Sequence, residues 1–177
     1  MNLYRYTETE LKKILKTLVI LCDTREQNNR HIKGYLENKS IPYQDKALNF
    51  GDYTAMIPAY PDMGILRELF FDQSIVIERK GSLNELSGNL TQGRERFKDE
   101  LTRASAAEVH LMIEGNSFSD IINHRYTTQF KENAYVASLL SMQCEYGFNL
   151  IFIDAENAGL YIYSILYYHV RKTLMKG

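Results

Sequence analysis

The chain has 177 residues, of which 45% are hydrophobic and 24% are charged, so its composition is neither that of a disordered segment nor that of a fibrous protein. This length is typical of one domain with a sizeable core, and we expect a single domain over residues 1–177. The formal net charge of −1 argues against binding of nucleic acid through bulk positive charge, although a local basic face is compatible with it.

The two cysteines, Cys22 and Cys144, both lie in apolar runs. They are too few for a disulfide framework and lack metal-ligand spacing, so we expect two buried free thiols in a reducing compartment. The first residues are polar and mixed in charge, and no apolar run approaches the roughly 20 residues of a membrane span. These features predict a soluble, intracellular protein with no membrane partner.

The first predicted elements are a strand and a helix. Residues 17–23 form a continuous apolar run with a polar end, which is typical of a strand that is covered on both faces. Residues 28–40 carry apolar side chains at helical spacing, and either Asn28 or Asn29 can serve as the N-cap.

Three more strands are predicted next. Residues 43–50 and 52–57 flank Gly51, and they predict two antiparallel strands with a bend at that glycine. Residues 74–79, which contain three consecutive β-branched residues, predict the following strand.

The second half of the chain alternates between helix and strand. Residues 93–107 have an amphipathic pattern that predicts a helix, and residues 108–115 predict a strand. A helix is predicted over residues 132–147, a last strand over 148–155 and a last helix over 156–176. This order predicts an α/β domain with a mixed central sheet and helices on both of its sides.

The strand at residues 74–79 runs directly into a glutamate, an arginine and a lysine. Because side chains alternate along a strand, Glu78 and Lys80 share one face and Arg79 lies on the other. A carboxylate and an ammonium at this spacing, roughly 7 Å apart, can both reach one metal-bound water or one phosphate. The structural alternative is a strand end that emerges into solvent, since such triplets are common by chance.

Two further acids stand at predicted strand ends. Asp52 follows Gly51 in an otherwise apolar stretch, and Asp23 ends the first strand, with Arg25 and Glu26 directly after it. Either aspartate can instead be an ordinary turn or cap residue. Carboxylates without a His or Cys cluster favour Mg²⁺ or Mn²⁺ over Zn²⁺.

The motifs DTRE (23–26), GDY (51–53) and IERK (77–80) occur in this order on successive predicted strands. Together they resemble the XPF-type structure-specific endonuclease domain, most clearly from about Leu18 to Ala104. The resemblance implies a restriction-endonuclease-like fold and a minimal nuclease domain of a bacterial or phage type, acting in the cytoplasm of such a cell.

The same resemblance implies roles for individual residues. Asp52 and Glu78 would bind the divalent cation, with the main-chain carbonyl of Arg79 as a further ligand, and Lys80 would be the catalytic lysine. Asp23 falls on the family's first acidic motif and is added to the catalytic set. DNA in a branched or flapped form is the implied partner.

Two departures from the family pattern stand out. The acid that usually follows the triplet falls on Asn84, which adds no negative charge. The adjacent Glu85 is expected to point elsewhere on a helix. No tandem helix-hairpin-helix module is visible, so the contacts to DNA must come from within the domain.

The predicted helix over residues 93–107 offers basic side chains for such contacts. Arg94 and Arg96 lie in its first turn, where the helix itself attracts phosphate, and Arg25 adds a third candidate contact. Lys98 and Arg103 are assigned instead to a solvated helix face. The polar, aromatic loop at residues 123–131 is a weaker candidate, and many loops share this composition.

The last helix is apolar nearly all round. Tyr161, Ile162, Ile165 and Tyr168 can belong to a buried core helix with hydroxyls at its rim, or to a homodimer face.

These patterns predict a Mg²⁺- or Mn²⁺-dependent DNA endonuclease that acts in repair, recombination or phage replication. The main alternative is a catalytically inactive DNA-binding or scaffold subunit, whose mark would be a broken Asp-Glu-Lys set. A sequence-specific restriction enzyme on the same fold is a weaker alternative.

Overall fold

The computed structural model describes residues 6–176. Within this part of the chain, seven strands form one sheet, and seven α-helices lie around it together with one 3-10 turn at Pro61–Met63. The strands are β1 (Val19–Cys22), β2 (Tyr43–Asp45), β3 (Tyr53–Ile57), β4 (Leu69–Phe70), β5 (Ile75–Lys80), β6 (Glu108–Glu114) and β7 (Asn149–Ile153). The α-helices are α1 (Glu8–Leu15), α2 (Arg30–Asn38), α3 (Leu83–Leu90), α4 (Arg94–Arg103), α5 (Phe118–Ile122), α6 (Glu132–Tyr146) and α7 (Ala155–Lys176).

The sheet is mixed, with the strand order β2-β1-β3-β5-β6-β7 and with β4 paired to β3. Strands β5, β6 and β7 run parallel to one another, whereas β3 is antiparallel to both β1 and β5. Residues of β5 and β6 pair along the whole of β5, from Ile75 with Glu108 to Lys80 with Ile113. The predicted α/β fold with a mixed central sheet is therefore confirmed.

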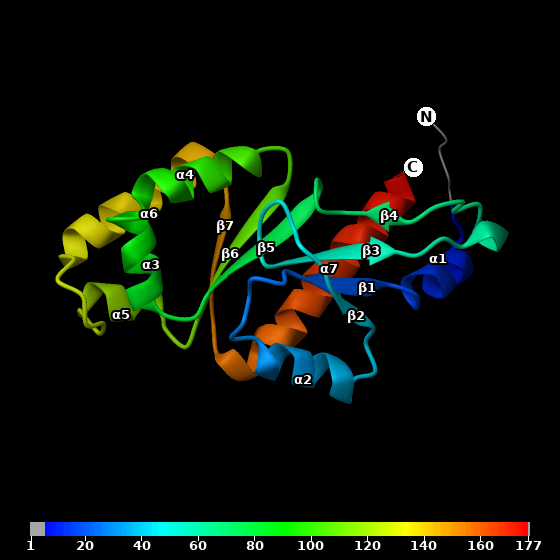
Figure 1. The fold of residues 1–177 in the computed structure, drawn as a ribbon, viewed down its shortest axis with the longest axis horizontal. Coiled ribbons are helices and arrows are strands. Elements are labelled where there is room, and N and C mark those ends of the chain that lie inside the picture. The colour runs from blue at the N-terminus through cyan, green and yellow to red at the C-terminus, as the bar shows by residue number, and fades with distance from the viewer. Residues whose placement is uncertain (1–5, 177) are drawn as a thin grey trace.

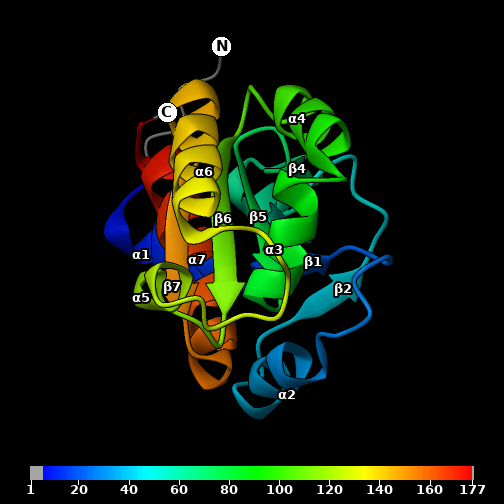
Figure 2. The ribbon, with the colours of Figure 1, turned by 90° about the vertical axis from the view of Figure 1, so that its left-hand side faces the viewer.

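The helices cover both faces of the sheet in two groups (Figures 1 and 2). Helices α3 to α6 gather at one end and cover one face, while α1, α2 and α7 pack on the other. The alternation along β5 divides its apolar residues between the two layers, because Ile75 and Ile77 join the α7 side and Val76 joins the opposite side.

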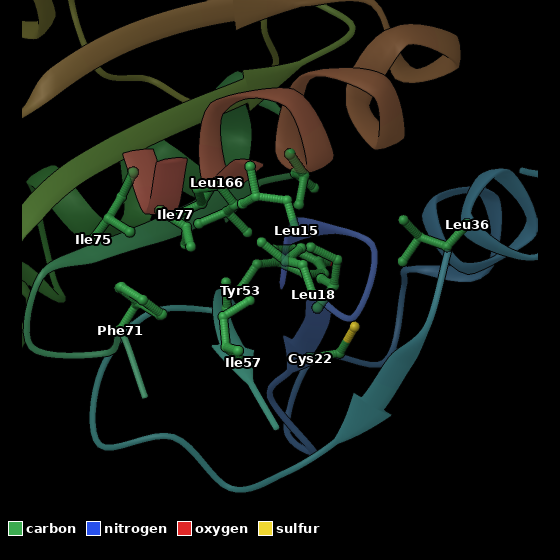
Figure 3. Packing of buried hydrophobic residues seen from close by; sticks show 14 of the residues in the cluster. Leu15, Leu18, Cys22, Leu36, Tyr53, Ile57, Phe71, Ile75, Ile77 and Leu166 are labelled. Atoms are coloured by element: carbon green, nitrogen blue, oxygen red, sulfur yellow. The ribbon is translucent and has the colours of Figure 1, made fainter. Parts of the chain in front are cut away.

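Helix α7 supplies the cover for the first face. Its side chains at Ala158, Ile162, Leu166 and Val170 recur every four residues and are fully buried. Figure 3 shows Leu166 in the same layer as Tyr53 and Ile77 of the sheet. Among residues 6–176, no helix is both long and apolar enough to span a membrane.

Most predicted elements are present within a few residues of their expected ends. Helix α6 ends before Gly147, which adopts a left-handed conformation with φ 68°, as expected of a glycine that terminates a helix. Asn29 is the N-cap of α2, although its side chain makes no capping hydrogen bond.

The two segments on either side of Gly51 differ from the prediction. Strands β2 and β3 do not pair with each other, because β1 lies between them, parallel to β2 and antiparallel to β3. Helices α1, α3 and α5 were not predicted as separate elements. Cys22 is buried, and burial raises the pKa of its thiol to about 12, but the expected burial of Cys144 is wrong because that residue is exposed on α6.

Gly51 lies at the point where the chain turns into β3. Its φ of +74° is in the left-handed region, and a Cβ added there would stand 3.0 Å from the Cβ of Val76 in β5. The absence of a side chain therefore lets the segment that carries Asp52 approach β5 closely.

We predict that Gly51→Ala lowers the free energy of unfolding by about 1–3 kcal/mol, because the substitution adds both backbone strain and a clash with Val76. Gly34→Ala is the matched control: Gly34 lies inside α2, where an added methyl group would meet open space, and this substitution should stabilise by about 0.5–1 kcal/mol. Urea denaturation measures both, and equal stability of Gly51→Ala and the wild type would contradict the close approach.

Candidate active site

A cleft of about 250 Å³ lies where β5, α3 and α4 meet the turn before β3. Its acidic lining residues are Asp52, Glu78, Glu85 and Glu100. Its basic lining residues are Arg25, Lys80, Arg96 and Arg103. The cleft thus combines carboxylates that can hold a cation with basic groups that can hold a phosphate.

Asp52 is fixed by hydrogen bonds of its main chain and of its side chain. Its N–H donates to Ile77 O at 2.8 Å, and its Oδ2 accepts from the N–H of Arg79 at 2.7 Å. Burial and the nearby charge of Glu78 raise the pKa of Asp52 well above its ordinary value. The ionised forms of Asp52 and Glu78 therefore disfavour each other when no positive charge lies near both.

Glu78 and Lys80 point into the cleft from the same face of β5, as the alternation predicts. The Lys80 ammonium donates to Glu78 Oε1 at 2.6 Å, and both residues are almost completely buried. Burial raises the pKa of Glu78, and Lys80 opposes that rise. Burial also acts to lower the pKa of Lys80, but the Glu78 carboxylate outweighs burial, so this pKa is raised and the lysine stays charged.

Arg79 leaves β5 on the opposite face and enters a buried ion-pair network. Its guanidinium donates to Glu114 Oε2 at 2.6 Å and lies 3.5 Å from Glu26 Oε2. His31 Nε2 of α2 is 2.9 Å from the other oxygen of Glu114. The network ties β5 to β6, to α2 and to the loop after β1.

The structure places Asp23 outside the cleft. Its buried carboxylate accepts hydrogen bonds from the main-chain N–H of Arg25 at 2.8 Å and from Arg25 Nε at 3.0 Å, and from the N–H of Leu48 at 3.3 Å. Burial alone raises the pKa of Asp23, but the hydrogen bonds from Arg25 outweigh it and leave this pKa low. Asp23 thus orients Arg25, whose side chain does line the cleft.

Helix α4 presents a different set of arginines from the predicted one. Arg96 lines the cleft with its side chain 86% exposed, and its Nε donates to Glu100 Oε1 at 3.0 Å. Arg103, assigned to solvent from the sequence, also lines the cleft. Arg94 does not, because its guanidinium turns back to Leu90 O at 3.4 Å. Residues 96, 100 and 103 share one helix face, and this spacing was the signal that could have identified Arg103.

Asn84, which stands where the family usually has an acid, and its neighbour Glu85 both point in directions that differ from the expectation. The Asn84 side chain faces away from the cleft, because its Oδ1 accepts from the N–H of Thr127 at 2.8 Å. The expectation that Glu85 points elsewhere is wrong: Glu85 lines the cleft, and its Oε1 lies 3.9 Å from Lys80 Nζ.

The donor set of the cleft fits a divalent cation that prefers oxygen ligands. Burial raises the pKa of both Asp52 and Glu78, and the charge of Glu78 raises that of Asp52 further, so a positive charge between them would stabilise both ionised forms. Among residues 6–176, no group of three or more His, Cys, Asp or Glu side chains has metal-binding spacing. Two carboxylate ligands from the protein are enough for Mg²⁺, since this ion is usually held by one or two carboxylates together with waters and phosphate oxygens.

Comparisons with known proteins identify the family to which this chain and its fold belong. The ERCC4 domain model matches residues 22–165, so the chain belongs to the ERCC4 domain family, and its fold is that of the XPF-type nuclease domain. Nucleases of this family generally depend on a divalent metal ion. A comparison with curated proteins found no match.

Two similar solved structures come from Aeropyrum pernix. XPF matches with a TM-score of 0.59 and 23% identity, over 84% of this chain and 59% of that chain. XPF in complex with DNA matches with a TM-score of 0.60 and 21% identity, over 87% of this chain and 66% of that chain. At these identities the likeness establishes the fold, and this chain spans less than two thirds of either XPF chain.

The ion pair between Glu114 and Arg79 generates a prediction about stability. Burial by itself raises the pKa of Glu114, but hydrogen bonds from Arg79 and His31 outweigh burial and leave that pKa below its ordinary value. The stabilisation is therefore complete above the unfolded pKa of about 4.3 and is lost as the pH falls through the lower folded value. Glu114→Gln should lower the free energy of unfolding by about 3 kcal/mol at neutral pH, since it removes the closer of the two charged partners of the buried Arg79.

The control for this substitution is Glu8→Gln, which removes a solvent-exposed pair with Arg171 and should cost less than about 1 kcal/mol. Urea denaturation at several pH values measures both variants. The gap between Glu114→Gln and the wild type should narrow below about pH 4. A gap that stays constant down to acid pH would contradict the ionised pair.

Proposed function

We propose that this protein is a metal-dependent endonuclease that hydrolyses phosphodiester bonds in branched or flapped DNA. The observation that carries the proposal is the convergence of Asp52, Glu78 and Lys80 in one cleft lined by arginines. Membership of the ERCC4 domain family and the likeness to an XPF that binds DNA support DNA as the substrate.

In this proposal the acidic residues hold the cation. Asp52 and Glu78 would be its side-chain ligands, and the main-chain carbonyl of Arg79 is the further ligand that we propose. When bound, Mg²⁺ or Mn²⁺ supplies a nucleophilic water of lowered pKa and neutralises charge on the scissile phosphate. The like charges of the two carboxylates are the reason why the cleft favours a cation over an empty state.

The basic residues act on the phosphate and on the water. The Lys80 ammonium is only a donor, so it can hold a phosphate oxygen or a lone pair of the attacking water, and it stabilises negative charge that develops in the transition state. Arg25 and Arg96 have largely exposed side chains at the rim, where they can contact neighbouring phosphates of the strand. Arg103 also lines the cleft and joins them in the proposal, and Arg94 stays a proposed DNA contact that lies outside the cleft.

The second candidate is an inactive DNA-binding or scaffold subunit. Such a subunit needs the basic rim but not the buried acids at the floor of the cleft. Unpaired or crowded carboxylates lower stability, so their retention beside a charged lysine favours the enzyme.

The function is tested by cleavage of flap, fork, four-way-junction and plain duplex DNA. Wild-type protein should cut one or more of the branched substrates with Mg²⁺ or Mn²⁺, and EDTA should stop cleavage. Asp52→Asn, Glu78→Gln and Lys80→Met should each lower the rate by about 100-fold or more, because each removes charge at the reacting phosphate while keeping shape.

The same variants separate catalysis from folding. Asp52→Asn removes one of two repelling buried carboxylates, so its free energy of unfolding should equal or exceed that of the wild type. Near wild-type cleavage by these variants, or restoration by Zn²⁺ but not by Mg²⁺, would contradict the proposed site. Efficient cutting of plain duplex at one sequence would favour a restriction enzyme, and DNA binding without any cleavage would favour the scaffold.

We also propose that the protein forms a homodimer through the outer side of α7. The core interpretation holds for one face of this helix, since Ile162 is fully buried. On the outer side, Leu160 is 49% and Tyr168 is 64% exposed. Exposed large hydrophobic side chains on one helix are a surface that proteins commonly cover.

Light scattering at micromolar concentration tests this assembly, and the expected mass is twice that of the chain. Tyr168→Glu should give a folded monomer, because this side chain is exposed and can carry a charge without burial. Thr173→Glu, at an exposed position on another side of α7, is the control and should remain dimeric. A monomeric wild-type protein would remove the proposal.

A further inference from the structure

The Lys80 ammonium lies among groups from three elements. Glu78 Oε1 of β5 accepts from it at 2.6 Å, and the ring of Phe97 on α4 lies 5.3 Å from Nζ. Glu85 Oε1 of α3 is 3.9 Å from Nζ. Lys80 is 5% exposed, so the groups packed around it shield its ammonium from solvent.

Glu85 is held in place by the start of α3. Its main-chain N–H donates to the Oγ of the N-cap residue Ser82 at 3.2 Å, and its Oε2 accepts from the N–H of Gly81 at 2.9 Å. The bond from Gly81 orients the carboxylate, and the bond to Ser82 caps the helix. One oxygen satisfies the cap, and the other, Oε1, is left facing Lys80.

The neighbours of Glu85 on α3 show that this orientation is specific. Asn84, one residue earlier, turns to Thr127 and leaves the cleft. Asn89, one helical turn later, lines the cleft, and its buried Oδ1 has no hydrogen-bond partner within residues 6–176. The cleft side of α3 therefore presents oxygen atoms from Glu85 and Asn89.

We propose that Glu85 is a positioning residue that holds the Lys80 ammonium in the cleft. If Glu78 were the only close carboxylate, it would draw the Lys80 ammonium onto itself. Glu85 is a second carboxylate, 3.9 Å from Nζ, that attracts the ammonium toward α3 and so leaves a donor free for a phosphate oxygen or water. The acid contributed by α3 is thus Glu85 and not a residue at position 84. The effect on cleavage rests on the proposed function, whereas the contact with Lys80 does not.

The competing explanation is that Glu85 only caps α3, and two variants separate the roles. Glu85→Gln keeps an amide oxygen that can accept from Gly81, as in capping boxes with glutamine, but removes the charge beside Lys80. Ser82→Ala removes the other half of the cap and keeps the charge. Asn84→Asp adds a charge on the adjacent residue, whose side chain faces Thr127.

Two measurements read out the contact. The first is the NMR chemical shift of the Lys80 side-chain amine, assigned with Lys80→Arg. The second is the single-turnover cleavage rate on the best branched DNA, together with DNA affinity measured in EDTA. Melting temperatures report the folding of each variant.

Glu85→Gln should shift the Lys80 amine signal and lower the single-turnover rate by about tenfold or more, the size of effect seen when a residue that orients a metal-site ligand is lost. Its DNA affinity should stay within about twofold, since the rim arginines are unchanged. Ser82→Ala should lower the melting temperature but leave the Lys80 signal and the single-turnover rate near wild type. Asn84→Asp should leave the melting temperature, the Lys80 signal and the rate unchanged.

An unchanged Lys80 signal in Glu85→Gln overturns the proposal, and so do equal losses of rate in Glu85→Gln and Ser82→Ala. If the wild-type protein cleaves no DNA, the proposed function fails, but the Lys80 signal still decides whether Glu85 holds the ammonium.

Discussion

The burial of two neighbouring carboxylates is the constraint on which the rest of this domain depends. Asp52 and Glu78 come from different segments of the chain, and each is unfavourable in its ionised form because of burial. Their compensation comes from the sheet: the N–H of Arg79 donates to Asp52, and Lys80 donates to Glu78. Gly51 permits the close approach to β5 that makes the first of these bonds possible. The main-chain geometry of β3 and β5 thus keeps the two repelling carboxylates in position at the cleft.

Strand β5 resolves the problem of a buried strand that ends in charged residues by giving every charge a partner. Glu78 and Lys80 pair with each other on the cleft side, and Arg79 pairs with Glu26 and Glu114 on the opposite side. The network around Arg79 does not enter the cleft, yet it anchors the residue whose N–H holds Asp52. A rigid second layer behind a reactive cleft is the arrangement that keeps such groups in position.

The sequence predicted what depends on local periodicity and failed where long-range pairing or helix phase decides. Alternation along β5 correctly separated Arg79 from Glu78 and Lys80, because strand geometry leaves no other option. The pairing of β2 with β1 was missed, since antiparallel neighbours in sequence are the default expectation and a crossover through α2 is not visible locally. Arg103 and Glu85 were misplaced because consecutive helical residues differ by about 100° in direction, and tertiary packing decides which face of α4 or α3 meets the cleft.

The net charge of −1 and the proposed DNA-binding role of the cleft are compatible because attraction and repulsion are spatially separated. The rim carries the exposed guanidinium groups of Arg25 and Arg96, whereas the floor carries Asp52 and Glu78. Under the proposed function, a phosphate backbone would be attracted to the entrance and repelled from the floor until positive charge neutralises the two acids. Lys80 supplies one such charge and is already hydrogen-bonded to Glu78, and within residues 6–176 no cationic side chain forms a direct hydrogen bond with Asp52. Burial and the nearby charge of Glu78 raise the pKa of Asp52, and a proton or a cation that arrives from solution relieves the cost of its ionised form.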